Sequence, residues 1–437
     1  MSTMEQVEVG KYQPYPEYKD SGVEWLGLIP KHWALRRAKF IFQRIQRPVR
    51  DIDGIVTAFR DGQVTLRSNR RIDGFTNALQ EIGYQGVRKG DLLIHAMDGF
   101  AGAIGISDSD GKCSPVCSVC TPISKTLAYP AYYGYLIRQL AVTGFITSLS
   151  KGIRERSTEF RFSEFSPLGL ALPPHSEQRT IAAFLDYETA RIDKLIAQQQ
   201  RLIDLLKEKR QAVISHAVTK GLNPDAPMKD SGVEWLGEVP EHWLVSSLKF
   251  IYKNLDYKRI PLSAEERGSK QGDYPYYGAS GIIDSIDDYL FSTDHVLVGE
   301  DGANLVMRST PIAFVATGQY WVNNHAHILR MNDGLNSYWA AVIENLDISP
   351  FVTGSAQPKL TAEALGNLIV AYPKTLQERI EIQEFINREK PKFTTLIDRA
   401  EHQVHLLKER RTALISAAVT GKIDLRGWTA STQEAAA

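Results

Sequence analysis

The sequence predicts an α+β protein in which one frame is built twice. The segment KDSGVEWLG at Lys19–Gly27 returns unchanged at Lys229–Gly237, 210 residues later. A second segment, LLKEKRQAVISHAVT at Leu205–Thr219, returns as LLKERRTALISAAVT at Leu406–Thr420, 201 residues later. Two halves of about 200 residues, each of domain size, therefore share an opening and a close, while the residues between them differ. We expect a common frame that carries two different surfaces.

The stretches between the repeated ends predict globular α+β domains. In both halves, short apolar runs alternate with Gly and Asp turns, which is typical of domains with short strands. The predicted order along the chain is an N-terminal tail (1–18), a first domain (19–175), a long helix (176–220), a linker (221–228), a second domain (229–373), a second long helix (374–420) and a C-terminal tail (421–437).

Two long helices are predicted from composition and periodicity. From about Ser176 to Ile214 the chain is rich in Glu, Gln, Lys, Arg, Leu and Ile and contains neither Gly nor Pro. Apolar residues recur there at alternate steps of four and three, as in a coiled coil. A similar series lies 201 residues later, so we expect the two helices to pair. The predicted seam consists of Ile181, Leu185, Ile192, Leu195, Leu202, Leu206 and Val213 in the first helix and Ile382, Ile386, Phe393, Leu396, Leu407 and Leu414 in the second.

The alternative to pairing is that each helix packs on its own domain. About 38 residues at 1.5 Å per residue span about 57 Å, which is longer than one domain face, so pairing is favoured. The second helix contains Pro391, which predicts a kink or a fresh helix start there.

Composition limits the broad class of protein. The chain has 437 residues, of which 43% are hydrophobic, and 51 basic residues balance 51 acidic ones. It can bury two cores, and its net charge by itself favours neither nucleic acid nor membrane. No apolar run approaches the roughly 18 residues that span a bilayer, and the polar start lacks a signal-peptide core. We therefore expect a cytoplasmic protein.

The three cysteines are close together in the sequence. Cys113, Cys117 and Cys120 fit a reducing compartment, and we predict structural or incidental thiols. Zinc ligation is the less favoured alternative, because no fourth Cys or His follows at a recognisable spacing.

Known catalytic motifs are missing from the sequence. There is no G-x-x-x-x-G-K-[ST] phosphate loop, no G-x-S-x-G elbow and no polar-Pro-Pro-aromatic motif of amino-methyltransferases; the nearest string is LPPH at Leu172–His175. We predict a noncatalytic chain that binds neither cofactor nor metal. His325 and His327 in NNHAHIL are predicted to be structural, with ligand or DNA contact as an open alternative and metal binding as a weaker one.

Several motifs occur in a family-specific order. These are P-x-x-x-E-Q-R at Pro173–Arg179, the two repeated helix ends, SGxEWLGxxPxHW at Ser21–Trp33 and Ser231–Trp243, and GSAQPKL at Gly354–Leu360. On these residues the whole chain resembles the DNA-specificity subunit of type I restriction-modification enzymes. One departure is visible, because Glu378 keeps the place of Glu177 while Arg379 replaces Gln178.

The resemblance implies an architecture and a set of partners. It implies two target recognition domains at opposite ends of a pair of antiparallel helices, with approximate twofold symmetry. Each domain would read one half of a split, asymmetric double-stranded DNA target, and helix length would set the unread spacer. Two methyltransferase subunits would dock on the helices, and restriction/translocase subunits would complete an adenine-methyltransferase and ATP-dependent endonuclease complex. S-adenosylmethionine, ATP and Mg²⁺ would then bind those partners and not this chain.

Candidate contact residues follow from side-chain chemistry. Arg, Lys, Asn and Gln on loops can contact base edges, whereas Lys and Arg also bind phosphate without reading sequence. The DNA-contact candidates are Lys151, Arg154 and Arg156, then Arg67, Arg70 and Arg71, in the first domain, and Gln357 and Lys359, then Asn323 and Asn324, in the second. The subunit-docking candidates are Lys207, Glu208, Arg210, Lys408, Glu409 and Arg411. Solvated surface charge and packing within the chain are the alternatives for these residues.

Two other functional classes remain open. One is a specificity chain whose partner fuses methyltransferase and nuclease; the other is a free-standing DNA-binding regulator or a coiled-coil adaptor. The neighbouring genes would distinguish a fused partner from separate methyltransferase and nuclease subunits. Specific DNA binding without a methyltransferase partner would favour the regulator.

Overall fold

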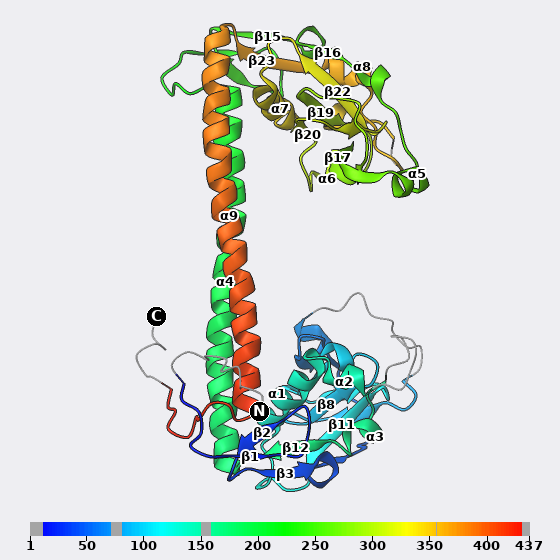
Figure 1. The fold of residues 1–437 in the computed structure, drawn as a ribbon, viewed down its shortest axis with the longest axis vertical. Helices are drawn as coiled ribbons and strands as arrows, with labels where there is room; N and C mark the ends of the chain where they lie inside the picture. Colours follow the sequence, from blue (N-terminus) through cyan, green and yellow to red (C-terminus); the bar gives the residue numbers. More distant parts are fainter. Residues whose placement is uncertain (1–11, 71–80, 150–158, 355, 431–437) are drawn as a thin grey trace. The chain divides into compact units, whose positions relative to one another are not determined.

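The computed structural model describes residues 12–70, 81–149, 159–354 and 356–430 (Figure 1). The chain divides into unit 1, Met1–Gln199 with Gln403–Ala437, and unit 2, Gln200–His402. Each unit contains one globular part and a portion of both long helices. Among the described residues, none of the helices is both long and apolar enough to cross a membrane.

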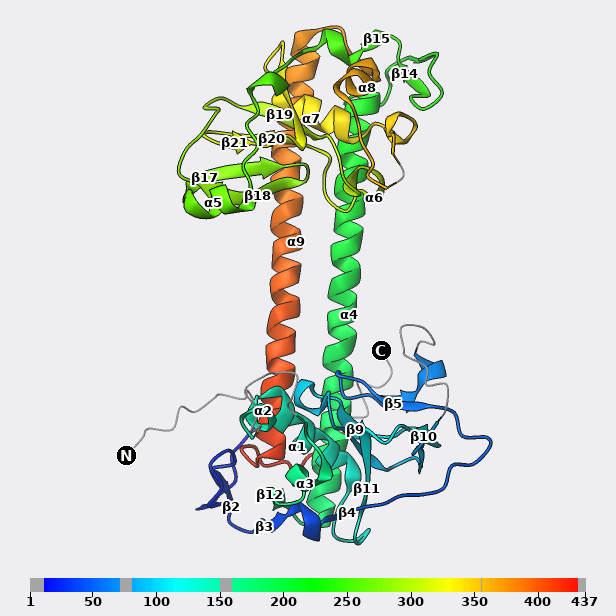
Figure 2. The same ribbon diagram turned by 90° about the vertical axis from the view of Figure 1, so that its right-hand side faces the viewer.

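The two long helices are α4 (His175–Lys220) and α9 (Leu376–Val419), with 46 and 44 residues. Helix α9 continues through Pro391, so the predicted fresh helix start is wrong, and the alternative of a kink stays a prediction. The ring of Pro391 is exposed, and the carbonyl that loses its hydrogen bond can be hydrated there. Both views show α4 and α9 side by side within each unit (Figures 1 and 2).

Unit 1 is built on an antiparallel sheet with the strand order β4-β11-β8-β9. Smaller pairs are β1 with β2, β3 with β12, β5 with β6, and β7 with β10. The elements are β1 (Tyr18–Asp20), β2 (Leu28–Pro30), β3 (Ala34–Arg37), the 3₁₀ helix η1 (Ala38–Phe40), β4 (Phe42–Arg44), β5 (Val56–Ala58), β6 (Val64–Leu66), η2 (Arg67–Asn69), β7 (Gln85–Val87), β8 (Leu92–His95), η3 (Gly99–Ala101), β9 (Ile104–Ile106), β10 (Gly111–Cys113), β11 (Cys117–Pro122), α1 (Pro130–Val142), α2 (Phe145–Ser148), α3 (Phe162–Phe165) and β12 (Gly169–Leu172).

Unit 2 repeats this frame with different additions. Its main sheet has the order β16-β22-β19-β20, and β13 pairs with β14 and β15 with β23. The strands β17, β18 and β21 form a further sheet, in place of the pairs β5-β6 and β7-β10 of unit 1. The elements are β13 (Met228–Asp230), β14 (Glu238–Pro240), β15 (Trp243–Ser247), η5 (Leu248–Phe250), β16 (Tyr252–Asn254), η6 (Asp256–Lys258), α5 (Ala264–Ser269), β17 (Gln271–Gly278), β18 (Gly281–Ile286), β19 (His295–Gly299), α6 (Asn304–Met307), β20 (Ala313–Ala316), β21 (Trp321–Val322), β22 (Ala326–Met331), α7 (Asn336–Glu344), η7 (Ser349–Phe351), α8 (Ala362–Asn367) and β23 (Ile369–Pro373).

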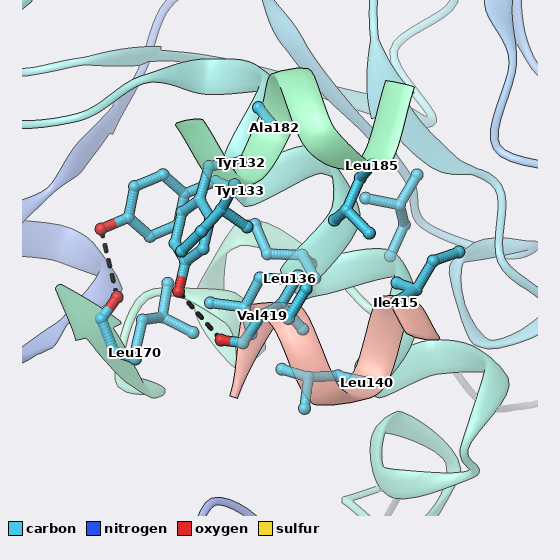
Figure 3. Packing of buried hydrophobic residues seen from close by; sticks show 14 of the residues in the cluster. Tyr132, Tyr133, Leu136, Leu140, Leu170, Ala182, Leu185, Ile415 and Val419 are labelled. Carbon is cyan, nitrogen blue, oxygen red and sulfur yellow. Dashed lines mark hydrogen bonds between the residues drawn. The ribbon is translucent and has the colours of Figure 1, made fainter. Parts of the chain in front are cut away.

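Each unit joins both helices to its globular part through one core. In unit 1, the start of α4 and the end of α9 pack around α1, and the Tyr132 hydroxyl donates to the Val419 carbonyl at 2.9 Å (Figure 3). In unit 2, the end of α4 and the start of α9 pack around α7 and β23. The helices therefore run in opposite directions within each unit.

The buried stripe of the helices recurs every eleven residues. In α4, Ile181, Ile192, Ile203 and Ile214 are between 0% and 9% exposed. In α9, Ile382, Val404 and Ile415 lie on an equivalent series and are likewise buried. Eleven residues make three turns at 3.67 residues per turn, close to a straight helix, whereas a heptad series drifts around it.

The predicted heptad seam is therefore only partly right. Its residues near the helix ends, including Ile181, Leu185, Ile382 and Leu414, are buried. Leu206, Val213, Phe393 and Leu407 are half-buried. Leu195, Leu202 and Leu396 are wrong as seam positions, because they are 39%, 44% and 46% exposed. The drift of the heptad series turns them outward.

Two adjacent residues test this spacing. Ile203→Ala should lower the free energy of unfolding by about 2–4 kcal/mol, because it removes a buried side chain. Leu202→Ala should cost less than about 1 kcal/mol, because its side chain is largely exposed. Urea denaturation of the full chain measures both losses. A larger loss for Leu202→Ala than for Ile203→Ala would support the heptad series instead.

Candidate nucleic-acid interface

The start of each long helix is anchored by the same His-Trp pair. In α4, Glu177 accepts a hydrogen bond from Trp33 Nε1 at 3.0 Å and lies 2.9 Å from His32 Nε2. In α9, Glu378 has equivalent contacts with Trp243 Nε1 at 3.0 Å and with His242 Nε2 at 2.8 Å. The repeated SGxEWLGxxPxHW motif thus places a His-Trp pair on the glutamate of each helix start.

The residue after that glutamate binds the part of each unit that differs. Gln178 is fully buried; its carboxamide accepts from the Tyr129 N–H at 2.8 Å and donates to the carbonyls of Leu127 and Pro173. Arg379 instead forms an ion pair with Asp333 and lies 5.7 Å from the centre of the Tyr372 ring. The departure at Arg379 therefore reflects a different neighbour.

Three loops of unit 2 meet in what we call the polar loop cluster: residues 300–302, 323–327 and 356–360, together with Arg259. Main-chain hydrogen bonds join the loops, from Gly302 to Pro358 at 2.9 Å, from Leu360 to Glu300 at 2.8 Å and from Glu300 to His325 at 2.9 Å. Gly302 has φ of 102°, a conformation that glycine adopts without strain. The strands β19 and β22 hold two of these loops at neighbouring positions of the main sheet.

A buried charge network supports the cluster. The Arg259 guanidinium forms an ion pair with Glu300 and donates to the Ala326 carbonyl at 2.9 Å. Nδ1 of His327 lies 2.6 Å from Asp256, and its Nε2 donates to the Leu360 carbonyl at 2.8 Å. Oxygen and nitrogen atoms of Asp256, Glu300 and His327 lie within 4.8 Å of one another, but these hydrogen bonds and the cation of Arg259 already satisfy them. We therefore describe a polar network and not a metal centre.

The network makes the cluster sensitive to acid. Burial alone would raise the pKa of Glu300, but the hydrogen bonds from Arg259 and Lys359 outweigh it and hold that pKa below its ordinary value. Burial would likewise raise the pKa of Asp256, but the hydrogen bond from His327 outweighs it and holds that pKa below its ordinary value. Carboxyl groups with lowered pKa values stabilise the fold above their unfolded pKa and lose this effect as the pH falls through the folded value.

Acidification should therefore loosen the polar loop cluster early. Hydrogen exchange of the full chain should show faster exchange at residues 323–327 below about pH 4, near the ordinary carboxyl pKa, while the core of β22 stays protected. Unchanged protection of these residues between pH 7 and pH 3 would contradict the role given to Glu300 and Asp256.

The exposed side chains of the cluster carry donors and acceptors. Lys359 is half-exposed with Nζ 3.0 Å from Glu300, and exposed Gln357 donates from Nε2 to Asp301 at 3.5 Å. The ring of His325 is also partly exposed, with Nδ1 2.8 Å from Asp301. Asn324 is exposed beside it. The structure thus brings Asn324, Gln357 and Lys359 together on one platform.

Asn323 differs from the expectation of an exposed reading residue. It is only 5% exposed, and its carboxamide oxygen accepts from the His325 N–H at 2.8 Å. Asparagine side chains commonly close turns in this way, so Asn323 shapes the loop. His325 and His327 also differ, because the turn exposes the first and β22 buries the second.

The candidates of unit 1 are less well placed. Four of them lie outside the described residues, namely Lys151, Arg154, Arg156 and Arg71. Arg67 is half-buried and donates to the Thr57 hydroxyl at 3.0 Å, whereas Arg70 pairs with Asp61 at 2.7 Å. The sequence reasoning did not select the residues of a cleft next to β8 and β11, which include Arg44, Met97 and Arg161. No local sequence pattern sets Arg44 and Arg161 apart from the other arginines of the first domain.

The cysteines are buried thiols. A hydrogen bond with Cys117 and burial raise the pKa of Cys113 far above its ordinary value, and burial raises the pKa of Cys120 to about 12. Cys113 and Cys120 therefore stay protonated at neutral pH. All three cysteines are free. In the described ranges, the one group with metal-ligand spacing is that of Asp256, Glu300 and His327.

Two docking candidates join the helices to each other. Arg411 of α9 donates twice to Asp193 of α4, at 2.9 and 3.3 Å, in unit 1. Lys207 of α4 lies 4.0 Å from Glu401 of α9 in unit 2. The other candidates are exposed or half-buried on the helix surfaces, namely Glu208, Arg210, Lys408 and Glu409.

Comparisons with known proteins agree on one family. A family model described as the type I restriction modification DNA specificity domain matches residues 240–394. The specificity subunit S.HindORF215P of Haemophilus influenzae is 32% identical over 116 residues, which are 26% of this chain and 29% of that protein. The EcoprrI specificity subunit of Escherichia coli is 28% identical over 134 residues, 30% of each chain. The chain thus matches less than a third of the length of these curated relatives.

A solved structure extends the likeness in fold. A chain from work on complex assembly and conformational transition of the type I restriction-modification system has a TM-score of 0.64 and 14% identity, and the match covers 90% of this chain and 99% of that one. At this identity the likeness concerns the fold alone. By the family model and the curated relatives, this chain is similar to the specificity subunits of type I restriction-modification enzymes.

Proposed function

We propose that this chain is the noncatalytic sequence-recognition subunit of a type I restriction-modification enzyme, and that each unit reads one half of a bipartite, asymmetric DNA target. The observation that carries this proposal is the repeated frame with unequal additions. The two main sheets share one strand order, whereas β17, β18 and β21 of unit 2 replace the pairs β5-β6 and β7-β10 of unit 1. Equal frames allow an equal approach to DNA, and unequal loops allow different bases to be read.

The polar loop cluster has the chemistry for reading one half-site. The carboxamides of Asn324 and Gln357 can donate and accept at once, as adenine requires in the major groove. The ammonium group of Lys359 suits guanine or a phosphate. Because Asp301 and Glu300 hold Gln357 and Lys359, these side chains lose less freedom when they bind.

We propose that the long helices set the spacer between the half-sites and dock two methyltransferase subunits. The 46 residues of α4 make a helix of about 69 Å, which corresponds to about two turns of DNA at about 34 Å each. Restriction/translocase subunits would join this assembly, and S-adenosylmethionine, ATP and Mg²⁺ would bind to the partners. The near-identical ends of α4 and α9 support binding of one partner in two copies.

Mapping methylated adenines in a genome that expresses this system tests the proposal. The expected result is a two-part motif with an unread centre of constant length. A continuous motif would overturn the split target. Replacing 229–373 with the corresponding part of a related chain should change one half of the motif only.

Two neighbouring residues of the cluster should differ in their effect on binding. Lys359→Ala should weaken binding to all duplexes similarly and lower the slope of log affinity against log salt by about 1, if its ammonium group contacts phosphate. Gln357→Ala should cost about 1–3 kcal/mol on the cognate half-site and relax the base preference at one position. Fluorescence anisotropy over a salt series separates the two effects, with Lys253→Ala in β16 as the matched surface control.

A further inference from the structure

The two units expose the same lysine-phenylalanine pair. The 3₁₀ turns η1 and η5 carry Lys39-Phe40 and Lys249-Phe250, which are 210 residues apart like the repeated opening segment. Phe40 is 55% exposed and Phe250 is 70% exposed. Each lysine lies over its own phenylalanine, with Nζ 5.1 Å and 5.5 Å from the ring centre. We call these two pairs the Lys-Phe turns.

Both turns are held in the same way. The N–H of Ala38 donates to the Leu168 carbonyl at 2.8 Å, and the N–H of Leu248 donates to the Leu368 carbonyl at the same distance. Ala38 and Leu248 are fully buried. The backbone angles before the turns are also alike, with φ and ψ of −68° and 141° in unit 1 and −70° and 140° in unit 2. The frame therefore fixes both phenylalanines outward.

The strand ends that lead into the turns do not share this likeness. Strand β3 ends in Arg36 and Arg37, whereas β15 ends in Ser246 and Ser247. A single exposed phenylalanine is unremarkable, since much of any protein surface is apolar. The same exposed pair in two units whose preceding strands end differently calls for a ligand that both units share.

We infer that each Lys-Phe turn docks one copy of a partner subunit that is present twice, and that the partner offers an apolar pocket with a carboxylate at its rim. Phenylalanine is a frequent anchor residue of protein interfaces, and the lysine beside it complements an acidic rim. DNA is a poorer candidate for this ligand. A phenylalanine ring cannot donate a hydrogen bond to a phosphate or to a base edge. The two half-sites of a split target also differ, whereas the two turns are alike. On the proposed function, on which this inference rests, the partner present in two copies is the methyltransferase subunit.

The stoichiometry of the complex tests the inference. The full chain is mixed with the purified methyltransferase subunit of the same system, and the complex is weighed by native mass spectrometry. The wild type should bind two copies. Phe40→Ala and Phe250→Ala should each weaken one of the two sites at least tenfold, as expected for loss of a buried aromatic anchor, and the double variant should weaken both.

The matched control is Tyr257→Ala. Tyr257 is 78% exposed with Lys258 Nζ 5.9 Å from its ring, so it has the same local chemistry in unit 2 alone. This variant should bind two copies with unchanged affinity. Thermal melting checks that each variant is folded, and Phe→Leu at both turns should recover part of the binding.

Three results would overturn the inference. If the double variant still bound two copies with wild-type affinity, the Lys-Phe turns would not be docking points. If the variants lost affinity for a DNA duplex with stoichiometry unchanged, DNA would be the ligand of the turns. If the wild type bound no methyltransferase subunit, the proposed function itself would fail, and this inference with it.

Discussion

Replacing Glu177 with alanine should lower the stability of unit 1 by about 3–5 kcal/mol. Its carboxylate is almost fully buried and accepts hydrogen bonds from Trp33 Nε1 and the Tyr15 hydroxyl, with His32 as a third partner. Burial and the hydrogen bond to Glu177 raise the pKa of Tyr15 well above its ordinary value, so Tyr15 remains a donor at neutral pH. Each donor left unsatisfied in the interior costs about 1–3 kcal/mol.

The equivalent residue of unit 2 provides the matched comparison. The side chain of Glu378 is 26% exposed, against 4% for Glu177, so water can replace its contacts in part. Glu378→Ala should therefore cost only about 1–2 kcal/mol. Urea denaturation with hydrogen exchange as a local readout assigns each loss to its unit. Equal small losses in both variants would show that the anchor contributes little.

On the proposed function, replacing Arg259 with alanine should strongly weaken recognition of the half-site assigned to unit 2. The guanidinium group joins Glu300 to the carbonyl of Ala326, and it is largely buried. Without the guanidinium group, the carboxylate of Glu300 is still paired with Lys359. The loops that contain Glu300 and Ala326, however, lose the side chain that joins them. We expect at least a 100-fold loss of affinity, about 2.7 kcal/mol, for the half-site read by unit 2. The other half-site should be read as before.

A duplex with one half-site scrambled makes this measurement specific. The variant should bind the intact duplex no better than the wild type binds a duplex that lacks the half-site of unit 2. Lys258→Ala is the matched control, because it removes an exposed positive charge next to Arg259 without breaking the network. If the two variants lost affinity equally, the effect would be one of net charge and not of loop support.

The sequence predicted the frame better than the surfaces. The mixed α and β content and the two long helices are confirmed. The Gly- and Pro-free stretch of the first helix and the motifs repeated in both helices report directly on local structure. The seam was wrong at Leu195, Leu202 and Leu396, because counting by heptads ignores the 3.6-residue turn of an unstrained helix. At least about five turns from either helix end, this small error had rotated the predicted residues outward.

Residues of the polar loop cluster could be predicted only in part. Three of the predicted residues are exposed in the structure, namely Asn324, Gln357 and Lys359. They could be predicted because their side chains can hydrogen-bond to base edges or phosphate and they lie in loops that contain Gly or Asn. Arg259 could not be found, because its role depends on a carbonyl and a carboxylate 41 or more residues away. Asn323 was misplaced because its neighbour Asn324 has the same chemistry, and only the turn decides which one is buried.

The different residues after the two anchoring glutamates limit how such chains can recombine. An exchange of the globular parts can use crossover points at the His-Trp pair and at the glutamate, since both anchors are alike. Gln178 and Arg379, however, each bind the domain of their own unit. A hybrid whose crossover falls before this residue would leave Asp333 without its cation, or bury an arginine where a carboxamide belongs. Functional hybrids should therefore carry the residue along with the domain that it holds.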